Sequence, residues 1–120
     1  MERLFFALDL KDDPAAIAEY ESWHGRGRIW PEVVSRLRAA GIEELEIHRC
    51  GNRLVMVMEV PEGFDPEEQP ALGRAAARVA EWEELMWQFQ RPLPFAKTGE
   101  KWVPMARIFS LKGLLGEQKR

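Results

Sequence analysis

Hydrophobic and polar residues alternate along the chain in blocks that predict several helices and strands. Residues 3–10 are rich in Leu and Phe and are typical of a strand. Asp13 followed by Pro14 predicts a helix start, because Asp caps free backbone N–H groups and proline fits the first helical position. We expect this helix to reach about His24, where residues 25–28, with two glycines, break it.

The middle of the chain predicts a second helix followed by a hairpin. Pro31 can open this helix, and Gly41 can end it as a C-terminal cap. Residues 44–50 and 54–60 are two strand candidates, joined by the Gly51-Asn52 pair that is typical of a tight hairpin turn. The second of these strands is apolar on both faces.

The C-terminal half predicts a loop over residues 64–70, a long helix over 71–90 and a last strand over 102–111. The helix is indicated by apolar residues at spacings of three and four, namely Ala76, Val79, Trp82, Met86 and Phe89. Pro92 ends this helix. Residues 113–120 form a C-terminal tail with too little apolar surface to require order.

The resulting order, β-α-α-β-β-α-β over residues 1–112, is that of a single α+β domain. It corresponds to the ferredoxin-like split βαβ arrangement, with its first crossover divided into two helices. The helices of this arrangement cover one face of the sheet, so strands that are apolar on both faces need another cover. A second copy of the chain is the simplest one, and we therefore expect a homodimer.

Composition narrows the class of protein. At 120 residues the chain can bury one modest core. Its 17 Lys and Arg against 20 Asp and Glu leave no basic stripe of the kind that binds nucleic acid. No run of about 18 apolar residues and no leader pattern is present, so we expect neither a membrane span nor a signal peptide. The single Cys50 cannot form an intrachain disulfide, which favours the cytoplasm.

Tyr20 and His24 are the first candidates for chemistry. They lie four residues apart in an expected helix, so their side chains share one face. Imidazole exchanges protons near neutral pH, and a phenol beside it makes a plausible proton-transfer pair. The residues alone equally allow His24 to cap a helix C-terminus and Tyr20 to be a half-buried amphipathic residue.

A second polar group lies on the first hairpin strand. Glu44, Glu46 and His48 alternate with Leu45 and Ile47, so the three polar side chains point to one face. His48 is a candidate for a second acid–base group, with Glu46 beside it. A solvated strand edge explains the same pattern.

Resemblance to a known family adds to these observations. Tyr20-x3-His24, followed by Ile29-Trp30-Pro31-Glu32-Val33, resembles the signature of the L-rhamnose mutarotase family, small proteins that interconvert sugar anomers. The resemblance continues through Gly51-Asn52-Arg53-Leu54, Glu81-Trp82-Glu83 and the stretch from Gly99-Glu100-Lys101-Trp102 to Ile108-Phe109, and so covers about residues 3–111. It implies a dimeric α/β barrel in which strands can be exchanged between copies.

The resemblance also implies roles for individual residues. His24 matches the proton donor of the family, Tyr20 matches a tyrosine that contacts the substrate, and Trp82 matches a wall of the sugar pocket. The implied substrate is a 6-deoxy-L-hexose, L-rhamnose or L-fucose. Opening its ring is general acid–base chemistry, for which we expect no redox cofactor, nucleophile or metal. Two histidines and one cysteine also lack metal-site spacing.

Four departures from the family pattern bear on the substrate. Glu83 stands where a second tryptophan is common, and its carboxylate can instead accept sugar hydroxyls. His48 stands where a tyrosine is usual, and Leu45 where some members have another tyrosine. Residues 25–28 number four where the best-known rhamnose enzymes have two, which we interpret as the mark of a subgroup acting on a different 6-deoxy sugar, such as L-fucose.

Two other classes of function stay open from the sequence. One is a cofactor-free monooxygenase or heme-associated dimeric αβ-barrel protein, for which a pocket lined by aromatic residues with few acid–base groups would speak. The other is a non-catalytic ligand-binding module, in which His24 points away from the pocket. The helical spacing of Trp82, Met86 and Phe89 is also that of an ordinary core.

Overall fold

The part of the chain that the structure describes is built on a curved antiparallel sheet of five strands. The structure is a computed structural model that describes residues 1–65 and 73–116, except for the side chains of 73–76. The central strand β1 pairs with β3 on one side and with both β4 and β5 on the other, while β2 lies outside β3. The strands are β1 (Glu2–Leu10), β2 (Glu44–Cys50), β3 (Arg53–Val60), β4 (Gln90–Arg91) and β5 (Val103–Pro104). The order β2-β3-β1-β4 is the ferredoxin-like one and confirms the expected α+β fold class.

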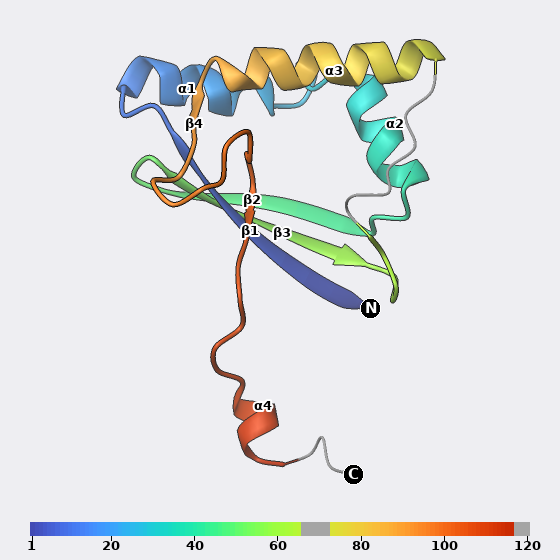
Figure 1. Cartoon of the computed structure of the whole chain (residues 1–120). Coiled ribbons are helices and arrows are strands. Elements are labelled where there is room, and N and C mark those ends of the chain that lie inside the picture. The colour runs from blue at the N-terminus through green and yellow to red at the C-terminus, as the bar shows by residue number, and fades with distance from the viewer. Residues whose placement is uncertain (66–72, 117–120) are drawn as a thin grey trace.

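Three helices cover one face of this sheet, as Figure 1 shows: α1 (Pro14–Trp23), α2 (Pro31–Ala39) and α3 (Gly73–Trp87). The sequence signals at their ends act as expected. The Asp13 side chain accepts a hydrogen bond from the backbone two residues later, and α1 begins directly after it. Gly41, at φ +90°, follows α2 in the left-handed conformation that ends helices.

The β2–β3 hairpin turns at the two predicted residues and is bound to β1. Gly51 takes a φ of +62°, which glycine adopts without strain. The Asn52 side chain donates a hydrogen bond to the Leu10 carbonyl at 3.0 Å, and the Leu10 N–H donates to the Asn52 carbonyl at 2.7 Å. These bonds hold the hairpin end against the end of β1, beneath α1.

Strand register divides the side chains between two faces. Even-numbered residues of β1 and β3 point toward the helices, where the most buried of them make the core: Phe6, Leu8, Leu10, Leu54, Met58 and Val60. The odd-numbered Phe5, Val55 and Val57 lie on the other face, which we call the open face. The strand β3 is therefore apolar on both faces, as its sequence predicts.

The predicted end of the long helix was wrong by one turn. Helix α3 ends at Trp87, and Gln90 and Arg91 pair with β1 instead of continuing it. Pairing with the free edge of β1 satisfies their backbone groups, and Pro92 prevents any return to helix. The expected loop residues 66–70 and helix residues 71–72 lie outside the described part of the chain.

The predicted last strand, 102–111, was also wrong in extent. Only Val103 and Pro104 pair with β1, followed by one hydrogen bond from the Met105 N–H to the Phe5 carbonyl. Pro104 lacks the N–H that a ladder needs, and the chain then leaves the sheet. Residues 105–116, which we call the C-terminal arm, lead away on the side opposite the helices (Figure 1). A short helix, α4 (Leu111–Leu114), spans the expected tail boundary.

Leu8→Ala tests the core. Leu8 is fully buried on the central strand, so its truncation should lower the free energy of unfolding by about 2–5 kcal/mol in urea denaturation. Val34→Ala is the control, because Val34 is 41% exposed on α2 and its truncation should change stability by less than about 0.5 kcal/mol. Equal effects of the two substitutions would contradict this core.

Candidate active site

A cavity of about 490 Å³ lies between the helices and the sheet. This volume is in the range of small-molecule sites. Most of its wall is apolar and includes Ile29, Val33, Leu37, Leu45, Ile47, Met56, Met58, Val79, Trp82 and Met86. The polar groups on the wall belong to Tyr20, His24, Arg36, Glu83 and Gln90. Few polar groups in an apolar enclosure are typical of a site that orients one small ligand.

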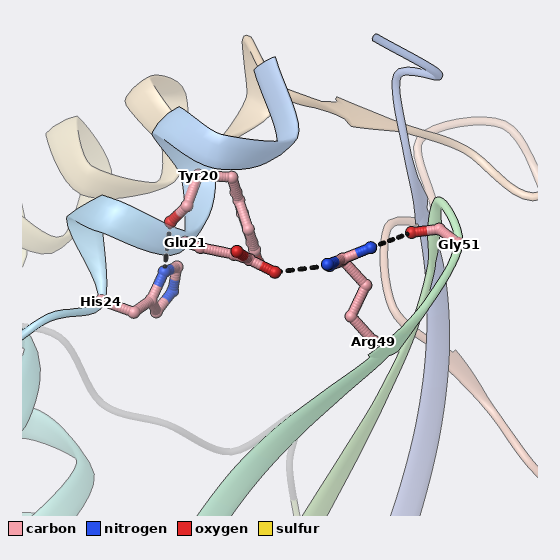
Figure 2. A network of polar contacts seen from close by, with 5 residues as sticks. All are labelled: Tyr20, Glu21, His24, Arg49 and Gly51. Atoms are coloured by element: carbon pink, nitrogen blue, oxygen red, sulfur yellow. Dashed lines mark hydrogen bonds and ion pairs between the residues drawn. The ribbon is translucent and has the colours of Figure 1, made fainter. Parts of the chain in front are cut away.

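His24 follows the last residue of α1, and its ring is held by the backbone of its own helix. Nδ1 lies 2.8 Å from the Tyr20 carbonyl oxygen (Figure 2). Because a carbonyl only accepts hydrogen bonds, Nδ1 carries the hydrogen and donates it. The ring orientation is thereby fixed, and Nε2 is left as the nitrogen that can take up and release a proton.

Tyr20 lies one turn before His24 with its ring inside the core. Its side chain is 3% exposed, and the ring centroids of Tyr20 and His24 are 4.7 Å apart. The hydroxyl oxygen accepts a hydrogen bond from Nε2 of Gln90 at 3.3 Å. Burial raises the pKa of Tyr20 to about 12, although the Gln90 bond acts in the opposite direction. The phenol therefore stays neutral near pH 7 and can act as a hydrogen-bond donor.

Trp82, on α3, is both a core residue and a wall of the cavity. It is 4% exposed, and its ring lies edge-on to three other rings. The centroid distances are 5.5 Å to His24, 5.3 Å to Trp30 and 6.3 Å to Trp23. The two interpretations of Trp82 from the sequence are therefore compatible in space.

Glu83 lies next to Trp82 at the exposed side of the cavity. Its carboxylate forms an ion pair with Lys101 Nζ at 2.7 Å, and the same ammonium lies 3.3 Å from the Glu83 carbonyl. Lys101 also lies 4.9 Å from the centroid of the Trp87 ring. The position where the resemblance leads us to expect a second tryptophan thus holds a carboxylate paired with a lysine.

A second cavity of about 380 Å³ shares Tyr20 and His24 with the first. Glu21 and Arg49 line it and form an ion pair, and Arg49 also donates to the Gly51 carbonyl at 2.8 Å (Figure 2). The pair is partly exposed and stabilises the fold by at most about 1 kcal/mol. It joins the last turn of α1 to the hairpin, on the side of His24 that faces β2.

Glu46 and His48 lie apart from this group of residues. Strand register aligns them with Val57 and Val55, which puts their side chains on the open face. There they contact each other, with His48 Nε2 2.9 Å from a Glu46 carboxylate oxygen. The structure thus brings Tyr20, His24, Trp82 and Glu83 together, and it leaves the Glu46–His48 pair on the other side of the sheet.

Gln90 and Arg36 are cavity residues that sequence reasoning missed. Gln90 was expected in the last turn of a helix, where a polar residue is ordinary. A glutamine followed by Arg91 and Pro92, directly after an apolar helix, was the available signal for a short strand. Nothing in the pattern around Arg36 distinguishes it from a surface arginine.

Comparison with known proteins identifies the family. The sequence pattern of L-rhamnose mutarotase matches residues 3–111. The chain belongs to the L-rhamnose mutarotase family. An L-fucose mutarotase from Xanthomonas campestris pv. campestris is 50% identical over 119 residues, covering 99% of this chain and 95% of the relative. An L-rhamnose mutarotase from Acidiphilium cryptum is 32% identical over 113 residues, covering 92% and 99%.

A solved structure extends the comparison to the fold. The crystal structure of an L-rhamnose mutarotase from Formosa agariphila superimposes with a TM-score of 0.63 at 21% identity, covering 92% of this chain and 99% of that one. The family resemblance and the fold class expected from the sequence are both confirmed.

The described residues also bear on membrane insertion and on metal binding. No helix within residues 1–65 and 73–116 is long and apolar enough to cross a membrane. In the same part of the chain, no three His, Cys, Asp or Glu side chains are grouped as ligands for a metal ion.

Titration of Tyr20 tests the geometry of the site directly, because it is the only tyrosine in the chain. Phenolate absorbance of the folded protein should rise with a midpoint at about pH 12. In the unfolded chain the midpoint should be about 10. The folded state favours the neutral phenol, so stability that is present below about pH 10 should be lost as the pH rises from about 10 to about 12, in total about 2–3 kcal/mol.

Tyr20→Phe is the control for this titration. It should lack the absorbance change and this part of the loss of stability at high pH, while other groups titrate as before. A folded-state midpoint near 10 would contradict the burial of the Tyr20 hydroxyl.

Proposed function

We propose that the protein is a sugar mutarotase that interconverts the α and β anomers of a 6-deoxy-L-hexose. The proposal rests mainly on the geometry of His24. Its Nδ1 is bound to a backbone carbonyl, and the residue lines an apolar cavity. Family membership supports the same conclusion over the monooxygenase-like and non-catalytic alternatives.

In the proposed mechanism His24 is the general acid and base. Its Nε2 gives a proton to the ring oxygen as the bond to the anomeric carbon breaks, while the anomeric hydroxyl gives its proton to a second base, for which the cavity offers Glu83. Rotation of the open-chain aldehyde exposes its other face, and both proton transfers then run in reverse. The ring closes as the other anomer.

The remaining residues bind and orient the sugar in this proposal. The neutral Tyr20 hydroxyl donates to a sugar oxygen, and Glu83 accepts from sugar hydroxyls. The Trp82 ring packs against C–H groups, and the aliphatic wall suits the methyl group of a 6-deoxy sugar. Tyr20, Trp82 and Glu83 line the same cavity as His24.

We propose L-fucose as the preferred substrate. Support comes from the 50% identical relative, which is an L-fucose mutarotase, against 32% identity to an L-rhamnose mutarotase. Residues 25–28, which lengthen the connection after His24, agree with this assignment. Both sugars open by the same chemistry, so the preference rests on how the pocket contacts their hydroxyls.

His24→Ala tests the mechanism. In saturation-transfer NMR the wild type should accelerate α/β exchange of L-fucose, and of L-rhamnose less strongly. The substitution should lower the catalysed rate by about 100-fold or more, because general acid–base catalysis contributes factors of that size. No acceleration of either sugar by the wild type would refute the function. Full activity of His24→Ala would refute the mechanism alone.

His48→Ala is the matched control, since His48 is the only other histidine. Its side chain lies on the open face, so the catalysed rate should stay within about two-fold of the wild type. Loss of activity would instead assign the Glu46–His48 pair to the site.

We also propose that the protein works as a cytoplasmic homodimer in which two open faces meet. The single cysteine supports the location. The dimer is supported by large apolar side chains that one copy leaves exposed. On the C-terminal arm they are Met105, Ile108, Phe109, Leu111, Leu114 and Leu115, with Ile108 95% exposed. An arm this apolar that leaves its own sheet fits exchange between two copies.

Light scattering of shortened chains tests the dimer. The full chain should have the mass of a dimer at micromolar concentration. A chain that ends at Pro104 should have the mass of a monomer, because it lacks the apolar arm. A chain that ends at Gly116 is the control and should remain a dimer. A monomeric full chain would contradict this assembly.

A further inference from the structure

Gln90 is a cavity residue for which the mechanism above has no role. It is the first residue of β4, and its backbone pairs with Leu10 of the central strand. The strand pairing fixes its Cα, and its side chain is buried, with the residue 5% exposed. A polar side chain held this firmly at a cavity wall calls for a hydrogen-bonding explanation.

Of the two polar atoms of the Gln90 amide, only one has a hydrogen-bond partner within the described part of the chain. Nε2 donates to the Tyr20 hydroxyl oxygen at 3.3 Å. Oε1 is buried and has no hydrogen-bond partner among the described residues. Buried carbonyl oxygens nearly always have a partner, because leaving one without it is unfavourable. Because Gln90 belongs to the wall of the cavity, a small rotation of its amide on ligand binding would let a ligand hydroxyl supply the missing donor.

The bond to Tyr20 has a second consequence. The phenol oxygen accepts from Gln90, so its own hydrogen is available to another acceptor. Burial keeps the phenol neutral, with a pKa of about 12, so this hydrogen is present at the pH where the protein works. The Tyr20 hydroxyl and the Gln90 amide therefore lie side by side, and both residues belong to the cavity wall.

We propose that Gln90 is a specificity-determining residue, whose Oε1 accepts a hydrogen bond from a sugar hydroxyl while its Nε2 orients the Tyr20 hydroxyl toward the ligand. The inference rests on the proposed function for the nature of the ligand. The ligand class that fits is a polyol with hydroxyls on neighbouring carbons, one donating to Gln90 and one accepting from Tyr20. A buried acceptor of this kind selects strongly against an analogue that lacks the hydroxyl, because the acceptor is then left without a partner.

Gln90→Met tests this role, because methionine has a similar length and no amide. The kcat/KM for L-fucose should fall at least ten-fold, mainly through a higher KM. Among the analogues of L-fucose that each lack one ring hydroxyl, one should show a clearly smaller loss than the others on going from wild type to variant. That analogue lacks the hydroxyl that Gln90 recognises, so only the loss of Tyr20 orientation affects it. A uniform loss on every analogue, or no loss on any, would overturn the inference.

Gln88→Met is the matched control. Gln88 lies two residues earlier, is exposed, and does not belong to the described walls of either cavity. Its kcat/KM should stay within two-fold of the wild type for every sugar. Thermal unfolding of both variants shows whether any loss in Gln90→Met reflects the site or the fold.

A binding measurement on the wild type separates this inference from the proposed function. The side-chain NH₂ signals of Gln90 should shift in ¹⁵N-resolved NMR as L-fucose is added. If the wild type binds the sugar with this shift but does not accelerate exchange, the mutarotase function fails and the role of Gln90 stands. If exchange is accelerated without the shift, the role of Gln90 fails and the function stands. If no sugar binds, both fail.

Discussion

The rest of the site depends on the packing of the buried Trp82 indole against three neighbouring rings. Trp82 is 4% exposed. Its ring contacts His24 at the end of α1, Trp30 at the start of α2, and Trp23 in the last turn of α1. The two ends of the connection over residues 25–29 are therefore held against the same ring of α3. Replacing this ring by a small side chain would loosen the cavity wall and the position of His24 together. The packing role of Trp82 is therefore inseparable from its place in the candidate site.

Helix ends and turns that depend on one or two neighbouring residues could be predicted from the sequence. The strands that form only by pairing with a distant segment of the chain could not. Asp13-Pro14 starts α1, Gly41 ends α2, and Gly51 turns the hairpin, each through the conformation of one or two residues. The strand β4 exists only because the edge of β1 is free to accept it. The same holds for β5, where the arm departs after Pro104 although its sequence continues to favour a strand.

The candidate site shows a similar division. Helical spacing correctly predicted that Tyr20 and His24 lie together, and Trp82, which the resemblance implied as a wall of the pocket, lies beside His24. Strand alternation correctly put Glu46 and His48 on one face, yet alternation does not determine which face the helices cover. Leu45 and Ile47, which take the covered face, were the signal, and it was ambiguous because both faces of the sheet are apolar.

The connection after His24 does not itself line the candidate site. Residues 25–28 are absent from the described walls of both cavities, whereas Ile29, which follows them, belongs to both. Arg28 stacks on Trp23 at 4.0 Å from the ring centroid, and Trp23 lies edge-on to Trp82, whose ring also contacts His24. Any effect of this segment on substrate choice must therefore come from the placement of Ile29 and of the rings around His24. Under the proposed function, substrate choice then rests on cavity shape and on the few hydrogen-bonding groups of the wall, because the proposed acid, His24, would serve the reaction of either sugar.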